Sequence, residues 1–203
     1  PQATRYFWSP NGYGLKKGEG YYQNIYVLWN QFSYGISDNF SMGGGIIPTF
    51  LFGAGVTPVF LTPKFSIPIK KDKINLGGGA LLGTVLGESE TGFGIVYGLS
   101  TFGSRDNNVS VGLGYGYAAG EWANSPLINL NGMFRIGSRA YFITENYFVN
   151  IGDGNIAILT MGGRWIIKKA ALDFFLAIPA SADMDIFVAF PVIGFTIPFG
   201  KTN

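Results

Sequence analysis

The chain has 203 residues, a formal net charge of +2, and only 13% charged residues against 47% hydrophobic ones. So small a net charge gives no reason to expect nucleic-acid binding, and the absence of cysteine and histidine excludes disulfides and histidine-based catalysis. No unbroken run of about 20 apolar residues is present, so a membrane-spanning helix is not expected. The 31 glycines interrupt the long apolar stretches and disfavour helices throughout.

Apolar residues alternate with small or polar ones over segments of roughly 10 to 14 residues, as in transmembrane β-barrels. In 108–119, for example, Val109 and Val111 fall on one face and Ser110 and Gly112 on the other. Twelve strands are predicted, at approximately 4–13, 21–36, 40–49, 58–69, 74–86, 93–103, 108–119, 126–136, 139–150, 156–167, 170–180 and 186–199.

Two kinds of connector alternate between these strands. Short polar turns are predicted at 37–39, 70–73, 104–107, 137–139 and 168–169. Longer loops are predicted at 15–20, 49–57, 87–92, 120–125, 152–155 and 181–185. This asymmetry is typical of outer-membrane barrels. The prediction is one all-β domain over 1–203, a transmembrane antiparallel up-and-down β-barrel with both termini on the short-turn, periplasmic side.

The charged residues divide in the same way between the two predicted rims. Eight of the 14 basic residues fall at the short turns: Lys70, Lys71, Lys73, Arg105, Arg139, Lys168, Lys169 and Lys201. Seven of the 12 acidic residues fall in the longer loops: Glu19, Glu88, Glu90, Glu121, Asp153, Asp183 and Asp185. Lys16 and Lys17 are placed with the longer loops too. A membrane-spanning barrel needs this separation, because a charge that faces hydrocarbon is costly.

Two charges lie inside the apolar stretch 156–178. If 168–169 is a two-residue turn, Arg164 and Asp173 face each other directly, and opposite charges on one face of a sheet attract. Small and polar residues share their face, whereas large apolar residues occupy the other. We therefore expect this pair to point into the barrel.

Further polar residues fit the same interior. Arg135 shares a face with Asn129 and Asn131, and a three-residue turn before the next strand would place Glu145 opposite Asn131. The residues expected to line the lumen and its constriction are Lys64, Asn129, Asn131, Arg135, Glu145, Arg164 and Asp173.

A polar lumen with a charged constriction predicts a narrow passive channel for small polar solutes or ions, with a mild preference for anions. The alternative is that these charges form a closed network inside a non-conducting barrel, a structural or accessory subunit of a larger outer-membrane complex. A third possibility is passage of apolar molecules to the membrane through a lateral gap near Pro191 or Pro198.

No enzyme activity, cofactor or metal is expected. The glycine-rich stretches lack the Lys-Ser/Thr pair of a phosphate-binding loop. Glu145 and Asp173 could be read as a carboxylate pair for glycoside chemistry, but a partner arginine beside Asp173 explains that residue more simply.

The last predicted strand reads "VIGFTIPFG". Its Gly194, Ile197 and Phe199 resemble the C-terminal β-signal of Gram-negative outer-membrane proteins, although four residues follow Phe199. The stretches "YGLKKGEGYYQN", "YGISDNFSMGGG" and "YFITENYF" are similar to uncharacterised outer-membrane barrels of Bacteroidota. The resemblance implies a bacterial outer-membrane location, contact with lipid and lipopolysaccharide, insertion by the barrel-assembly machinery, and association with other outer-membrane proteins.

Overall fold

The computed structural model describes residues 2–88, 91–150, 154–181 and 188–201. Its barrel strands are β1 (Glu19–Ile25), β2 (Trp29–Gly35), β3 (Phe40–Ile46), β4 (Thr57–Lys70), β5 (Ile74–Leu86), β6 (Phe93–Gly103), β7 (Asn107–Ala118), β9 (Leu127–Arg135), β10 (Ala140–Asn150), β11 (Asn155–Ile167), β12 (Ala170–Ser181) and β13 (Phe190–Gly200). A two-residue strand, β8 (Glu121–Trp122), pairs with the end of β7 and is not part of the barrel wall. In the described part of the chain, no helix is both long enough and apolar enough to cross a membrane.

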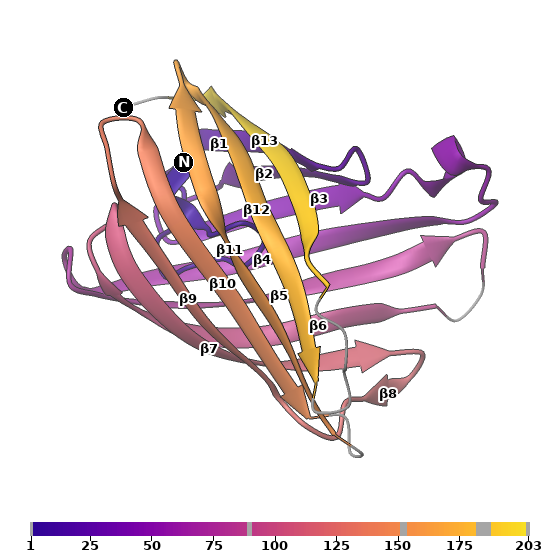
Figure 1. Ribbon diagram of the computed structural model, residues 1–203. Helices are drawn as coiled ribbons and strands as arrows, with labels where there is room; N and C mark the ends of the chain where they lie inside the picture. Colours follow the sequence, from indigo (N-terminus) through magenta and orange to yellow (C-terminus); the bar gives the residue numbers. More distant parts are fainter. Residues whose placement is uncertain (1, 89–90, 151–153, 182–187, 202–203) are drawn as a thin grey trace.

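The twelve strands form one closed antiparallel barrel (Figure 1). Each strand pairs with its neighbours in the chain, with β7 joined to β9 past the short β8. The barrel closes where β13 pairs with β1, from Glu19 opposite Gly200 to Ile25 opposite Gly194. The antiparallel barrel and the number of strands are therefore as predicted.

Alternate side chains along the strands point outward, and most of these are large and apolar. Outward residues such as Phe65, Leu130, Trp165 and Ile197 are 46 to 56% exposed. In the described barrel strands, the outward positions carry no Asp, Glu, Lys or Arg except Lys70, the last residue of β4. The outer wall is therefore an uncharged apolar belt.

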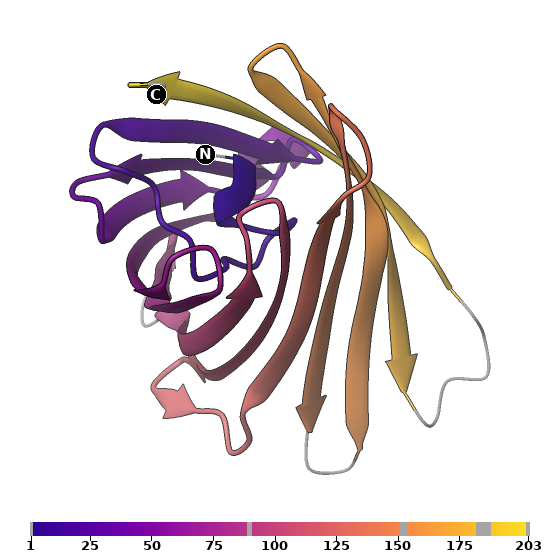
Figure 2. The same ribbon diagram turned by 90° about the vertical axis from the view of Figure 1, so that its left-hand side faces the viewer.

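The first predicted strand, 4–13, is wrong. This region begins with a short 3-10 helix, η1 (Gln2–Thr4), and has one isolated bridge between Arg5 and Pro10. Residues 3–14, which we call the N-terminal segment, lie inside the ring of strands (Figure 2). Tyr6 and Phe7 are fully buried there, and the Phe7 ring stacks on that of Phe175 at 3.9 Å.

The second predicted strand, 21–36, is also wrong, because it is the hairpin of β1 and β2. The two errors cancel in the strand count. They also move residues 15–18, which precede β1, from the predicted long-loop end to the short-turn end of the barrel. Gly18 donates a backbone hydrogen bond to Gly35, and Lys17 to the carboxylate of Asp38 in the next short turn. Lys16, Lys17 and Glu19 therefore lie at the short-turn end and not at the long-loop end. Of the predicted long-loop acids, Glu90, Asp153, Asp183 and Asp185 lie outside the described residues.

Candidate functional site

The buried ion pair between β11 and β12 binds the N-terminal segment. Arg164 lies directly opposite Asp173, as predicted, and donates from Nε and Nη2 to its two carboxylate oxygens at 2.7 and 2.9 Å. Its Nη1 and Nη2 also donate to the carbonyl oxygens of Arg5 and Tyr6, at 3.2 and 2.5 Å. The arginine thus satisfies a wall carboxylate and two backbone carbonyls of the segment at once.

Glu145 on β10 binds the next residues of the segment. Its carboxylate accepts hydrogen bonds from the backbone N–H groups of Phe7 at 2.7 Å, Trp8 at 3.0 Å and Ser9 at 3.0 Å. Glu145 lies opposite Asn131, as the predicted turn required. Because successive backbone N–H groups converge on one carboxylate, this part of the segment is fixed to the wall by a charge-assisted contact.

Two more basic side chains complete these contacts. Lys64 on β4 donates to the carbonyl oxygens of Thr4 at 3.0 Å and Tyr13 at 2.7 Å. Arg5 reaches in the other direction, to Gln23 on β1 at 2.9 Å and to Thr196 on β13. The segment is therefore held from several sides of the barrel.

Six of the seven predicted lumen residues face the interior. They are Lys64, Asn129, Asn131, Glu145, Arg164 and Asp173. The two asparagines donate to the hydroxyl of Ser9, at 3.1 and 3.2 Å. Five of them bind the chain's own N-terminal segment, and the sixth, Asp173, binds Arg164. They therefore do not border an unobstructed water-filled passage.

Arg135 does not belong to the lumen. It is the last residue of β9, and its side chain, 39% exposed, pairs at the rim with Asp106 at 2.7 Å. It also donates to the carbonyl oxygens of Gly137 and Ser138. By the alternation of β9, Arg135 is at an inward position. Because the strand ends at this residue, its side chain lies at the rim and not inside the barrel.

The residues that resemble a β-signal lie on the closing strand. Ile197 and Phe199 point outward from β13 and are 49% and 39% exposed, while Gly194 faces inward opposite Asp173. Arg5, Gln23 and Thr196 were missed in the sequence as parts of the site. Arg5 lies in the region wrongly predicted as a strand, and a lone inward Gln or Thr gives no signal of its own.

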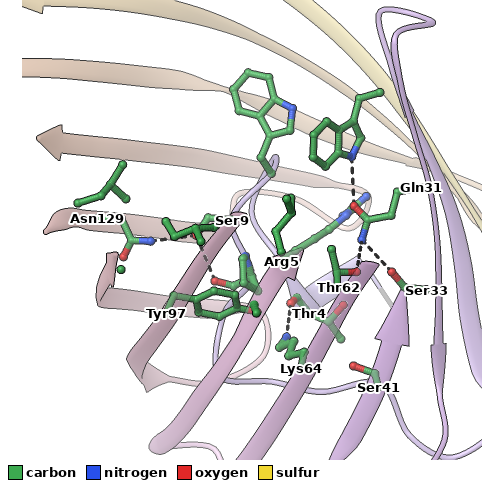
Figure 3. Close-up of a pocket in the computed structure, with 18 of the residues that line it drawn as sticks. Thr4, Arg5, Ser9, Gln31, Ser33, Ser41, Thr62, Lys64, Tyr97 and Asn129 are labelled. Atoms are coloured by element: carbon green, nitrogen blue, oxygen red, sulfur yellow. Dashed lines mark hydrogen bonds between the residues drawn. The ribbon is translucent and has the colours of Figure 1, made fainter. Parts of the chain in front are cut away.

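A cavity of about 210 Å³ borders the N-terminal segment, and Figure 3 shows residues that line it. Its wall residues Trp29 and Ile95 lie near the long-loop ends of β2 and β6. Its polar side includes Arg5, Lys64 and a hydrogen-bonded group in which Gln31 donates to Ser33 and Thr62. Its apolar side includes Trp8, Trp29, Leu81, Ile95 and Leu127. No Asp or Glu is among the described residues that line it.

No protein-family model matches the sequence, and no curated protein matches it either. Within the residues that the structure describes, no group of three or more His, Cys, Asp or Glu side chains is placed to hold a metal ion. The fold, the bound N-terminal segment and the cavity are therefore the observations from which a function has to be inferred.

Proposed function

We propose that this protein is an integral β-barrel of a bacterial outer membrane and that it is a gated narrow channel, closed by its own N-terminal segment. A small solute enters from the long-loop end, and its passage requires movement of residues 3–14. The observation that carries this proposal is that Lys64, Glu145 and Arg164 hold the backbone of the segment inside the barrel.

The outer wall supports the membrane location. The uncharged belt suits hydrocarbon, and basic residues such as Lys70, Lys71 and Lys73 gather at one rim. By analogy with other outer-membrane barrels, the short turns face the periplasm, as do the start of β1 and the end of β13. Recognition of β13 by the barrel-assembly machinery and contact with lipopolysaccharide belong to the same proposal.

The lumen charges support a weak anion preference. The two charged residues among the described lining of the cavity, Arg5 and Lys64, are both basic. With the segment displaced, the wall would keep Lys64, Arg164, Glu145 and Asp173 as a mixed-charge constriction.

A second candidate is a non-conducting barrel that serves as an accessory subunit of an outer-membrane complex. The apolar contacts of the segment favour it, because Tyr6 and Phe7 pack with Met133, Ile143 and Phe175 in one buried cluster. Such packing would hold the segment in place even if its polar contacts were weakened.

Conductance of the purified protein in planar bilayers separates the two candidates. The double variant Arg164→Met/Asp173→Leu removes both charges and leaves the carbonyls of Arg5 and Tyr6 without these donors. We expect rare openings in the wild type and frequent current steps in this variant. The matched control is Arg135→Gln/Asp106→Asn, which removes the rim pair without touching the segment and should behave as the wild type.

A crosslink tests whether the steps come from movement of the segment. The chain has no cysteine, so Ser9→Cys with Asn131→Cys adds the only two thiols, at side chains in contact with each other. Joining them with a short thiol-specific reagent in the Arg164→Met/Asp173→Leu background should abolish the steps. A folded double variant that stays silent would reject the channel and favour the non-conducting barrel.

A further inference from the structure

We infer that the lumen cavity binds a small amphipathic monoanion, with its carboxylate at Arg5 and Lys64 and its apolar body against Trp29, Leu81 and Ile95. The inference names the class of ligand that the lumen of the proposed channel binds. It rests on the proposed function in one respect, that the long-loop end of the barrel is open to solvent. Binding itself requires no passage through the barrel.

The charges of the lining select an anion. Arg5 and Lys64 are its two charged side chains, and both described partners of Lys64 are neutral carbonyl oxygens. Arg5 is 2% exposed, and its Nη1 has no hydrogen-bond partner in the described part of the chain. A buried guanidinium nitrogen without an acceptor is costly, and a bound carboxylate would supply one.

The nearby carboxylates do not neutralise these two cations directly. Asp173 is bound by Arg164 in a two-point contact, and Glu145 accepts three backbone hydrogen bonds from the segment. Neither residue lines the cavity. An ammonium group on a ligand would therefore find no carboxylate among the described residues of the lining.

The apolar side of the cavity limits the size and the kind of ligand. The Trp29 ring is fixed by stacking on Phe60 at 4.3 Å and by a hydrogen bond to Gln31. Leu81 and Ile95 point inward from neighbouring strands on the same side of the cavity. A cavity of 150 Å³ holds benzene, so the 210 Å³ here accommodates about eight to ten non-hydrogen atoms. This size suits a short aliphatic or aromatic acid and excludes a nucleotide.

Trp8 and Trp29 provide a direct readout, because both line the cavity. The other two tryptophans, Trp122 and Trp165, are 56% and 46% exposed and are absent from its lining. In a Trp122→Phe/Trp165→Phe background, fluorescence therefore reports on the cavity. The probe is 6-bromohexanoate, a monoanion whose bromine quenches tryptophan at short range.

We expect saturable quenching by 6-bromohexanoate that is reversed by hexanoate but not by acetate, which lacks the apolar body. Its neutral analogue, 6-bromo-1-hexanol, should bind at least tenfold more weakly. Equal quenching by the alcohol and the acid would overturn the inference, and this comparison needs no variant of the site. Quenching that rises without saturation would also overturn the inference, because it indicates only partition of the probe into the surrounding detergent or lipid.

Variants in the same background identify the cation. Arg5→Gln should weaken binding of 6-bromohexanoate at least tenfold, whereas Arg135→Gln, at the rim, should leave it unchanged. Binding by a folded Arg5→Gln variant with unchanged affinity would contradict the assignment to Arg5. The binding experiment does not depend on conductance. Saturable acid binding without current steps would therefore reject the channel and support the ligand site. Current steps without saturable binding would support the channel and reject the ligand site.

Discussion

Arg164 combines complete burial with a set of polar contacts that its guanidinium geometry permits. It binds both oxygens of Asp173 and two backbone carbonyls in different directions. Lysine has a single nitrogen at its end and does not reproduce this arrangement. Removing one member of a buried pair is more harmful than removing both, because the remaining charge loses its partner.

This asymmetry gives a prediction for stability. Arg164→Met alone should lower the free energy of unfolding by about 3–5 kcal/mol, because Asp173 stays buried without its cation. Arg164→Met/Asp173→Leu should cost less than that single change. Urea unfolding in lipid vesicles measures both, and a double variant less stable than the single one would contradict the reasoning.

The rim pair gives a prediction for pH dependence. Partial burial alone would raise the pKa of Asp106, but hydrogen bonds from Tyr141 and Arg135 outweigh it and hold the pKa below its ordinary value of 3.8. A carboxyl with a lowered folded-state pKa stabilises the fold above its unfolded-state pKa and loses this contribution as the pH falls through the folded value.

Asp106→Asn should therefore be less stable than the wild type at pH 7, and the difference should shrink below about pH 4. Unfolding titrations at both pH values check this. In an Arg135→Gln background the effect should be smaller, because one of the groups that lower the pKa is gone. A stability difference that is the same at pH 7 and pH 3 would refute this assignment.

At the scale of elements, the turn between β1 and β2 contains residues that disfavour its backbone conformation. Tyr26 and Val27 have φ angles of 54° and 66°, in the left-handed region that favours glycine and asparagine. A β-branched residue such as valine is especially unfavourable there. The side-chain amide of Asn24 accepts a hydrogen bond from the Val27 N–H and helps to hold the turn.

Val27→Gly should therefore raise the free energy of unfolding by about 1 kcal/mol, part of the left-handed penalty being offset by glycine's greater freedom in the unfolded chain. Leu28→Gly is the matched control. It lies in the same turn but is not among the residues with positive φ, so it should give no gain. Unfolding in lipid vesicles measures both, and destabilisation by Val27→Gly would show that its side chain stabilises the turn.

The same turn explains which elements could be predicted from sequence. Strands β5 and β6 have the predicted bounds, because polar or glycine-rich connectors flank a clear alternation. The stretch Tyr26–Leu28 has no Gly, Pro, Asn or Asp to mark a turn, so β1 and β2 were merged into one predicted strand. Arg164 and Asp173 could be paired because a two-residue turn fixes the register of everything beyond it.

At the scale of the whole molecule, the apolar belt predicts insertion into lipid. Leu130 lies near the middle of β9, points outward and is 48% exposed. Leu130→Arg should destabilise the folded state in lipid vesicles by about 2–4 kcal/mol. Ile136→Arg, one residue past the end of the same strand, should cost at most about 1 kcal/mol because it lies near the interface. Equal costs at the two positions would argue against a bilayer around β9.

The belt could be predicted because alternation depends only on the residues of each strand. The interior could not, because its main occupant is the N-terminal segment, whose partners lie far away in sequence on β1, β4, β10, β11 and β13. Six lumen residues could still be found, since each lies on the strand face opposite the large apolar side chains. What they bind could not be deduced from that rule.

The position of the segment has a consequence for biogenesis. Residues 3–14 precede all of these partners in the chain, and Thr196, which binds Arg5, lies on the closing strand β13. The segment therefore cannot complete its contacts until β13 has paired into the wall. We therefore expect protection of Tyr6 and Phe7 from solvent to develop only when β13 pairs with β1.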